Sequence, residues 1–467
     1  MNKNNIKINI PKDAQFIIDQ LQKHNFQSYV VGGCVRDAIL GREPHDWDIC
    51  TSATPEEMLV ILRHTYHYHV IPTGLKHGTV TVMLHEEPYE VTTFRKDVEY
   101  SDGRHPDKVE FVTDIIEDLS RRDFTINAMA YNDEEGLVDP FNGKQDLLNK
   151  TIKCVGEAKD RFGEDALRML RAIRFAAQLG FEIDNTTSVW IHSLKGHIKD
   201  LSWERIASEF CKIAQTNNFH EMMYAYADVF AEIIPEIEPM LGFDQKNPYH
   251  KYDVYTHTLH AVKNCKSEDL VTKLAVFFHD IGKPDCAVSD KNDSNRLHFY
   301  GHGEVSAKIT DDIMRRMKFD NKTRESVVEL VKYHDASFEV TEKCVRRWLN
   351  KMGPEQFDRL LTLREADISA QNMEYLPERL QKVKNMRKLF DEIMQRQQCF
   401  LMKDLAINGR DLINLGYKQG KELGETLNNL LQMVIDGEIS NDKDEMIAYL
   451  TVHLGIELAK EEEQQER

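Results

Sequence analysis

The stretch 29–52, YVVGGCVRDAILGREPHDWDICTS, decides the fold that the sequence predicts for the N-terminal part of the chain. It begins with an apolar run, Tyr29–Val31, which is typical of a buried strand, and Gly32-Gly33 follows directly. Two glycines let backbone N–H groups approach phosphate oxygens closely, and Arg36 adds a positive charge one helical turn later. This order of strand, glycine turn and helix predicts a cradle for a nucleoside triphosphate.

Two carboxylates follow the cradle within the same stretch. If Trp47 lies in a strand, Asp46 and Asp48 project from one face about 6.5–7 Å apart, a spacing that suits one or two Mg²⁺ ions. Glu90, in a later β-like run, is a candidate third carboxylate. Glycine turns and alternating carboxylates also occur in ordinary turns and solvated strands, so the Mg²⁺ prediction depends on their combination.

The composition is that of a soluble protein with several domains. The chain has 467 residues, 41% hydrophobic and 30% charged, and no apolar run approaches the about 18 residues of a membrane span. Eight cysteines without a C-x-x-C pair favour a reducing, cytoplasmic compartment. The formal net charge of −18 implies that a nucleic acid would have to bind at a local positive groove. We therefore expect a cytoplasmic protein that does not associate with membranes.

Helical and β-like patterns change along the chain and divide it into predicted segments. Short β-like runs and helices alternate at first, whereas helical spacing dominates from about residue 150. A stretch rich in His and Tyr, 245–258, marks a further change. The predicted α+β architecture comprises a small head with a mixed sheet at 1–150, a helical neck and body at 151–244, a histidine-bearing domain at 245–375 and a helical tail at 376–467.

Local signals place several elements within these segments. The predicted elements are, in chain order, strands at 68–71, 78–84 and 89–94, a polar loop at 97–110, a helix at 119–131 with Ser120 or Asp123 at its N-terminus, and one continuous helix at 162–179. No strand is expected beyond about residue 150.

A second group of candidate residues lies in RRDFTIN, residues 121–127. Paired arginines, Arg121 and Arg122, can clamp phosphates, while Asp123 and Asn127 can bond to ribose hydroxyls. Helix capping with ordinary surface ion pairs is the alternative interpretation of the same residues.

The third group is Asp165-x-x-Arg168, followed by Arg171 and Arg174 at three-residue steps. On one helix face, Asp165 and Arg168 would present acceptor and donors in one plane, which could recognise cytosine or adenine and reject uracil and guanine. The alternative is an intrahelical ion pair that stabilises the helix by a few tenths of a kcal/mol.

A histidine-bearing block forms the fourth group. Histidines and aspartates spread over successive predicted helices, including an adjacent His-Asp pair, can converge on a divalent metal. The candidate ligands are His257, His279, Asp280, His302, His334 and Asp367. A vestigial domain with buried neutral histidines remains the alternative.

Taken together, these motifs resemble the class II nucleotidyltransferases, the family of bacterial tRNA CCA-adding enzymes and poly(A) polymerases. The resemblance rests on Gly32-Gly33-x-x-Arg36-Asp37, Asp46-x-Asp48, RRDFTINAMA and EDALRMLRAIRF. It implies phosphate contacts at Gly33 and Arg36, Mg²⁺ at Asp46 and Asp48, triphosphate and ribose contacts at Arg122 and Asp123, base selection by Asp165 and Arg168, and further nucleotide contacts at Arg171 and Arg174. LAVFFHDIGKP and HFYGHGE resemble the HD phosphohydrolase superfamily, which implies a divalent metal at the histidine block, with a transition metal as one candidate.

Further segments distinguish between the two activities of that family. Residues 71–80, IPTGLKHGTV, and the loop containing Asp102-Gly103-Arg104 resemble CCA-adding enzymes. The resemblance implies transfer of CMP and AMP from CTP and ATP to the tRNA acceptor end with release of pyrophosphate. A poly(A) polymerase, or a metal-dependent phosphohydrolase as the main activity, remains the alternative, and the sequence leaves the oligomeric state open.

Overall fold

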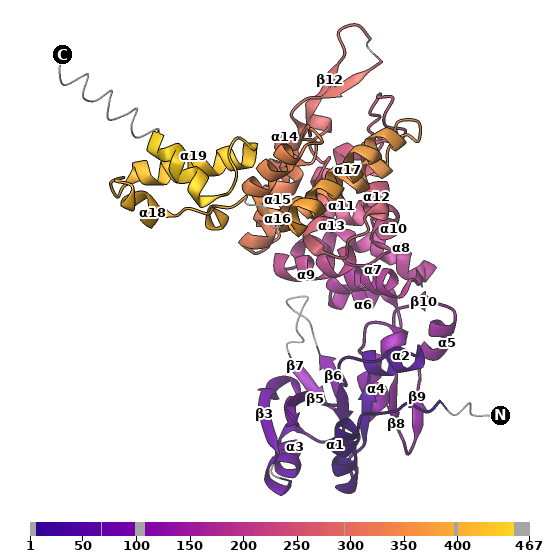
Figure 1. Ribbon diagram of the computed structural model, residues 1–467. Coiled ribbons are helices and arrows are strands. Elements are labelled where there is room, and N and C mark those ends of the chain that lie inside the picture. The colour runs from indigo at the N-terminus through magenta and orange to yellow at the C-terminus, as the bar shows by residue number, and fades with distance from the viewer. Residues whose placement is uncertain (1–5, 67, 99–107, 294, 397–399, 453–467) are drawn as a thin grey trace. The chain divides into compact units, whose positions relative to one another are not determined.

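A computed structural model describes residues 6–66, 68–98, 108–293, 295–396 and 400–452 (Figure 1). The loop predicted around Asp102–Arg104 lies outside these residues. The chain divides into two compact units, Met1–Pro235 with Arg316–Phe319, and Glu236–Arg315 with Asp320–Arg467. The four predicted segments remain a prediction.

The first unit begins with a seven-stranded mixed sheet of order β3-β4-β5-β2-β1-β8-β9 (Figure 1). Its strands are β1 (Ser28–Val31), β2 (Ile49–Thr51), β3 (His69–Gly74), β4 (Thr79–Leu84), β5 (Glu87–Thr93), β8 (Ala130–Asn132) and β9 (Gly136–Val138). Strands β2 and β5 pair in parallel, and the other neighbours are antiparallel. The mixed sheet and the α+β class are thus confirmed.

Short helices surround this sheet. They are α1 (Lys12–Lys23), α2 (Gly33–Ile39), α3 (Pro55–Met58), α4 (Ile115–Ser120) and α5 (Gly143–Leu148). Buried Tyr29, Cys50, Phe94 and Leu119 belong to one core cluster, so the inner strands are anchored against α4. A capping box between Thr54 and Glu57 starts α3, as the S/T-x-x-E pattern predicts.

Three local predictions about the head were wrong. Asp46–Asp48 precede β2 instead of lying in a strand, although the Asp48 carbonyl accepts a hydrogen bond from the Val31 N–H at 3.0 Å. Part of the predicted loop 97–110 is a two-stranded ladder, β6 (Arg95–Val98) with β7 (Lys108–Phe111).

The helix predicted at 119–131 is absent, because its residues pair with a distant segment. The chain leaves α4 at Ser120, makes a single 3₁₀ turn at Thr125–Asn127 and enters β8. The Asp123 carbonyl accepts from Val155 N–H, and Thr125 N–H donates to the Lys153 carbonyl. These long-range backbone bonds override the local helical signal.

Beyond the sheet, the first unit is mainly helical. It contains α6 (Ala158–Glu164), α7 (Leu167–Leu179), α8 (Asn185–Leu194), α9 (Trp203–Ala214), α10 (Phe219–Ala225) and α11 (Ala227–Ile233). The predicted helix 162–179 is interrupted: Asp165 is extended, and its carboxylate accepts from the Leu167 N–H at the start of α7. Strands also continue past residue 150, as β10 (Thr151–Ile152) and β11 (Glu182–Ile183) form a parallel pair.

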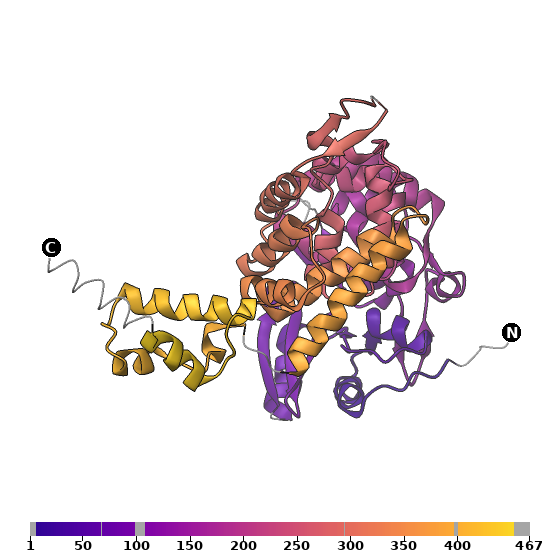
Figure 2. The same cartoon turned by 45° about the horizontal axis from the view of Figure 1, so that its top comes forward.

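The second unit is built from helices and one hairpin. Its elements are α12 (Val254–Asn264), α13 (Leu270–Phe278), β12 (Ala287–Ser289), β13 (Leu297–Phe299), α14 (His302–Arg316), α15 (Asn321–Tyr333), α16 (Glu342–Ser369), α17 (Leu376–Gln395), α18 (Gly409–Asn414) and α19 (Lys421–Asp436). Helix α16 is kinked at Gly353, whose φ of 78° is followed by Pro354. Helices α16 and α17 pack together, as the orange segments show in Figures 1 and 2.

Aspartates fix where the helices of the second unit begin. Asp253, Asp269 and Asp320 accept hydrogen bonds from backbone N–H groups at the starts of α12, α13 and α15. A separate apolar cluster that includes Leu412 and Ile435 joins α18 and α19. Across the described residues, no helix is both long and apolar enough to span a membrane.

Candidate active site and metal centre

The glycine turn holds the first part of the candidate active site. Gly32 adopts φ +83°, and a Cβ there would lie 3.0 Å from Nη1 of Arg122, so both conformation and space favour glycine. Arg36 follows on α2. Its guanidinium binds both carboxylate oxygens of Asp37 at 2.9 Å and donates from Nη1 to Asn127 Oδ1 at 2.7 Å.

The three predicted carboxylates share one neighbourhood beside this turn. The parallel register pairs Ile49 with Val91, so one residue earlier Asp48 lies beside Glu90. Partial desolvation by the surrounding protein raises the pKa of Asp48, although its side chain still reaches solvent; Arg122 opposes this rise, and Glu90 and Asp46 add to it. All three side chains are nevertheless exposed.

The donor set fits a hard divalent cation, because carboxylates that repel one another are stabilised by shared positive charge. The three carboxylates do not, however, form a tight cluster. Among the described residues, three potential ligand atoms lie within 4.8 Å of one another only in two groups that share Asp280, and neither group contains Asp46, Asp48 or Glu90.

Arg122 lies between the glycine turn and these carboxylates, and Asp118 holds it. Asp118 was not identified from the sequence, yet it is only 1% exposed. It accepts from Arg121 at 2.8 and 3.0 Å and from Arg122 Nη2 at 3.3 Å. Burial opposes ionisation, but Arg122 and Arg121 hold the pKa of Asp118 below its usual value.

Asp123 and Asn127 form a hydrogen-bonded chain with two arginines. Asn127 Nδ2 donates to Asp123 Oδ1 at 3.1 Å, and Arg171 donates to Asp123 Oδ2 from Nε and Nη2 at 2.8 and 2.5 Å. Burial disfavours the charge of Asp123, but Arg171 and Asn127 lower its pKa to about 2. The polar edge predicted to bind ribose is therefore continuous from Arg36 to α7.

Phe175 organises the arginines of this region, a role that its place in an apolar helical pattern did not reveal. The guanidinium carbons of Arg36, Arg171 and Arg174 lie 5.2, 5.4 and 4.1 Å from its ring centroid. Arg174 also donates to Glu209 Oε2 at 2.6 Å. Cation–π attraction thus gathers three like charges around one buried ring.

Asp165 and Arg168, predicted to select the base, do not pair with each other. Asp165 Oδ2 accepts from Arg205 of α9 at 2.7 Å, and Arg168 Nη1 donates to Glu164 at 2.6 Å. The helix is interrupted between α6 and α7, so Asp165 lies outside α7 while Arg168 lies in it. The expectation that the two residues share one helix face is therefore wrong. Arg205 was not identified from the sequence as a partner of Asp165.

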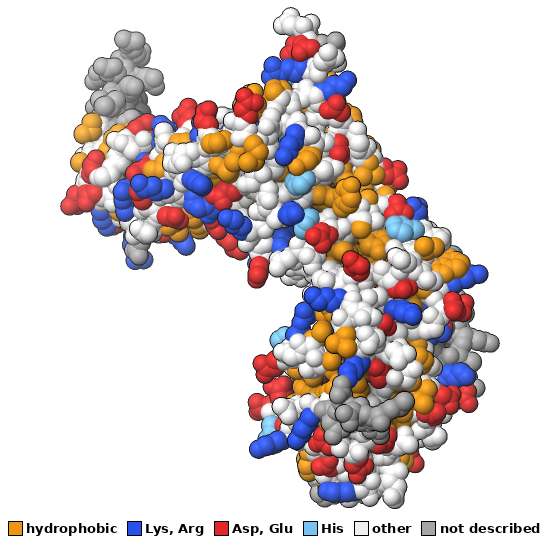
Figure 3. Space-filling model, turned by 90° about the vertical axis from the view of Figure 1, so that its right-hand side faces the viewer, with side chains coloured by type: hydrophobic (Ala, Val, Ile, Leu, Met, Phe, Trp, Pro, Cys, Tyr) orange, Lys and Arg blue, Asp and Glu red, His pale blue; other side chains and the backbone are white. Residues whose placement is uncertain are grey.

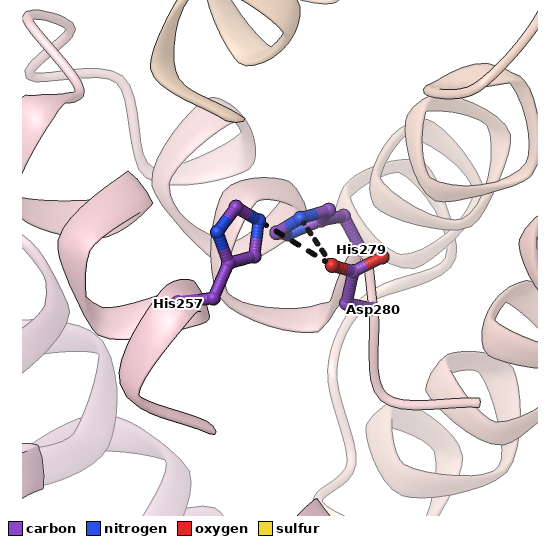
Figure 4. Close-up of side chains that lie close together, drawn as sticks. All are labelled: His257, His279 and Asp280. Atoms are coloured by element: carbon purple, nitrogen blue, oxygen red, sulfur yellow. Dashed lines mark ion pairs between the residues drawn. The ribbon is translucent and has the colours of Figure 1, made fainter. Parts of the chain in front are cut away.

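The second candidate centre, in the second unit, brings the predicted histidines and aspartates together. His257 and His279 face Asp280 Oδ2 at 3.5 and 3.0 Å (Figure 4). His302 and His334 face Asp280 Oδ1 at 3.4 and 3.6 Å. Asp280 therefore lies between two groups of imidazoles, each of which could hold one metal ion.

Asp367 completes the first group. Its Oδ1 lies 3.0 Å from Nε2 of His257 and 3.7 Å from Nε2 of His279. Burial opposes protonation, yet Asp280 and Asp367 raise the pKa of His279 to about 10. Lys283 Nζ already lies 2.7 Å from Asp280 Oδ2, and a proton on an imidazole or a metal ion would supply further positive charge to the two carboxylates.

The imidazole tautomers favour a metal ion. Nδ1 of His302 and of His334 each lies within 2.8 Å of a backbone carbonyl, which can only accept, so each Nδ1 carries the proton. Their Nε2 atoms are 3.0 Å apart, and in the neutral rings both present lone pairs. A shared cation removes this repulsion, and histidine nitrogens with carboxylates suit transition metals.

A cavity of about 310 Å³ opens beside this centre. Four of the candidate ligands line it, namely Asp280, His302, His334 and Asp367, together with Lys283, Arg379, Tyr249 and Tyr300. Arg379 donates to Gln371, which donates to Asp367 at 3.2 Å, so α17 contributes a cation beside the metal ligands. The sequence did not identify Lys283, Gln371 or Arg379.

The exposed surface carries both signs of charge. In the view of Figure 3, basic and acidic side chains are interspersed.

The mixed sheet with its glycine turn and carboxylates defines a nucleotidyltransferase. Three family descriptions match the chain: "Poly A polymerase head domain" at residues 28–153, "Probable RNA and SrmB- binding site of polymerase A" at 180–241 and "tRNA nucleotidyltransferase domain 2 putative" at 302–450. The CCA-adding enzyme of Ligilactobacillus salivarius is 32% identical over 452 residues, covering 94% of this chain and 96% of that protein. The CCA-adding enzyme of Staphylococcus aureus is 32% identical over 449 residues, covering 95% and 98%. The chain belongs to the family of CCA-adding enzymes.

Solved structures agree with this assignment. The CCA-adding enzyme of Bacillus stearothermophilus in complex with CTP has a TM-score of 0.68 and 27% identity, covering 96% of this chain and 98% of that one. The Thermotoga maritima enzyme complexed with tRNA has a TM-score of 0.60 and covers 96% and 97%, and at 22% identity it supports the fold alone.

Proposed function

We propose that the chain adds CMP and AMP, from CTP and ATP, to the 3′ end of tRNA. The observation that carries this proposal is the convergence of the glycine turn, Arg122 and the Asp46, Asp48 and Glu90 carboxylates in one open site. In each transfer the RNA 3′ oxygen forms a bond to the α-phosphorus, the bond from that phosphorus to the β-phosphate oxygen breaks, and pyrophosphate leaves. Mg²⁺ bound at Asp46 and Asp48 would supply charge stabilisation and activate the attacking hydroxyl.

The chain's own residues bind and orient the nucleotide. The Gly33 backbone N–H, Arg36 and Arg122 bind the phosphates, because clustered donors suit a polyanion, whereas the Gly32 N–H donates to the Met129 carbonyl and Gly32 shapes the turn. Asp123 and Asn127 bind the ribose.

Selection of the base falls to α7 and its N-terminus. Asp165 and Arg168 contact the base edge, and for this Asp165 exchanges its bond to Arg205 for one to the base. Arg171 and Arg174 hold the adjoining phosphates or base.

The decisive experiment incubates the protein with tRNA lacking its 3′ CCA, using CTP and ATP separately and together, and sequences the products. Addition of CC with CTP alone and of CCA with both nucleotides is expected. Long A-tails on unstructured RNA would instead identify a poly(A) polymerase. The absence of any incorporation would contradict both activities.

A second function is favoured by the facing Nε2 atoms of His302 and His334. We propose that the histidine centre binds a transition metal and hydrolyses phosphate esters in the adjacent cavity. Water oxygen would form a bond to phosphorus while the ester P–O bond breaks, and Lys283 and Arg379 would bind the anionic oxygens. The metal would supply the acidified water.

Metal analysis and assays with 2′,3′-cyclic nucleotides test this second function. Purified protein should contain metal and hydrolyse the cyclic ester, and a metal-free, inactive protein would contradict it. We also propose a cytoplasmic location, which the seven free cysteines among the described residues support.

A further inference from the structure

Asp118 is a buried carboxylate that serves several groups around the nucleotide site. Besides Arg121 and Arg122, it accepts a hydrogen bond from the Arg95 backbone N–H at 3.2 Å. Arg121 Nε in turn donates to the Arg95 carbonyl at 3.1 Å. Asp118 thus joins α4, the arginine pair and the first residue of β6.

The orientation of Arg122 depends on this carboxylate. Among the described residues, Asp118 is the hydrogen-bond partner recorded for the Arg122 guanidinium, and the buried Nε of Arg122 has none. With Nη2 held by Asp118, Nη1 lies at the glycine turn, 3.0 Å from the Cβ position of Gly32. The side chain is 21% exposed, so it remains accessible to a phosphate.

Arg122 has a competing partner in the same site. Its charge acts on Asp48, and the charge of Asp48 acts on Arg122. Without Asp118, the guanidinium would be attracted to the exposed Asp48 carboxylate. Such a pair would remove a phosphate donor and occupy a metal carboxylate at once.

We propose that Asp118 is a positioning residue for nucleotide addition, which holds Arg122 at the phosphate turn and keeps it from pairing with Asp48. This inference rests on the proposed nucleotidyl transfer at that site. Asp118 itself contacts neither substrate nor metal, and it acts through Arg122. Its identity matters because an anion can hold two partly buried guanidinium groups without leaving their charge uncompensated.

The test compares the wild-type protein with Asp118→Asn, which keeps the side-chain shape and removes the charge. Equilibrium binding of CTP in EDTA reports the phosphate contacts without metal, and steady-state assays give KM and kcat. We expect Kd and KM for both CTP and ATP to rise about tenfold or more, with a smaller change in kcat. Glu117→Gln removes the same charge from an exposed neighbouring position on α4 and should leave these values unchanged.

A double-mutant cycle with Arg122→Gln separates positioning from a general structural effect. If Asp118 acts through Arg122, the Asp118→Asn/Arg122→Gln protein binds CTP no more weakly than Arg122→Gln alone. Additive losses, or a folded Asp118→Asn protein with wild-type KM, would overturn the inference. Thermal unfolding identifies a variant that fails to fold, in which case Asp118→Glu, which retains the charge, is tested for the same Arg122 dependence. Wild-type protein that adds no nucleotide contradicts the proposed function instead.

Discussion

The guanidinium of Arg171 on α7 holds the carboxylate of Asp123 through two hydrogen bonds, from Nε and Nη2 to Oδ2. Asp123 in turn bonds to Asn127, which accepts from Arg36. The residues that would bind ribose and phosphates therefore form one network with the helix that would read the base. Such a network links nucleotide binding to the position of α7.

The Asp123–Arg171 pair predicts acid sensitivity. The pKa of Asp123 is about 2 in the folded protein, against about 3.9 in an unfolded chain. At pH values above the pKa of the unfolded chain, the lowered pKa of Asp123 adds about 2–3 kcal/mol to the free energy of unfolding. This contribution is lost as the pH falls towards 2. Urea unfolding of the wild type and of Asp123→Asn at pH 5 and pH 3 measures this contribution to the free energy of unfolding. The wild type should lose more stability than the variant over this range, and equal losses would contradict the prediction.

Loss of one metal carboxylate should stop nucleotide addition. Asp48→Asn or Asp46→Asn is expected to lower kcat/KM by at least about a hundredfold, because each removes charge that holds the cation. Binding of tRNA, measured by filter retention, should change little. Glu87→Gln, an exposed site on the same strand as Glu90, is the matched control. Substantial incorporation by both aspartate variants would remove these residues from the metal site.

Arg168→Ala should relax the choice of nucleotide, because the base edge loses its guanidinium donors. Incorporation of UTP and GTP relative to CTP and ATP measures the effect, and the forbidden nucleotides should gain about tenfold or more in relative kcat/KM. Lys159→Ala, on the neighbouring helix α6, should keep the wild-type preference. An unchanged preference in Arg168→Ala would assign base selection elsewhere.

If the histidine centre binds metal as proposed, removal of the Asp280 carboxylate should abolish that binding. Asp280→Asn is expected to have less than about a tenth of the wild-type transition-metal content by elemental analysis, because both imidazole groups face this residue. Glu304→Gln, exposed on the same helix as His302, should retain the metal. CCA addition should persist in both variants if the two centres act independently. A full metal complement in folded Asp280→Asn would contradict a bridging role.

The candidate residues come from the sequence, whereas the partners that the structure gives them do not. Gly32, Arg36 and Asp48 lie within one short stretch, so their proximity follows from a single strand–turn–helix unit. No local pattern singles out Asp118, because its partners depend on how α4 packs against the sheet. Arg379 is even harder to predict, since it lines the histidine cavity from a helix that lies more than a hundred residues after His257 in the sequence.

The sequence by itself determined the α+β class, the glycine turn, the carboxylates and the set of possible metal ligands, because each depends on residue type and short spacing. Only the tertiary structure decided that the chain is not helical at Asp123 and Asp165, although the local sequence pattern predicts a helix at both. At those positions, hydrogen bonds to Val155 N–H and Arg205 compensate the helical bonds that are lost. It also decided which charge faces which, since the free energy of a buried ion pair depends on distance and desolvation, and neither can be read from local sequence.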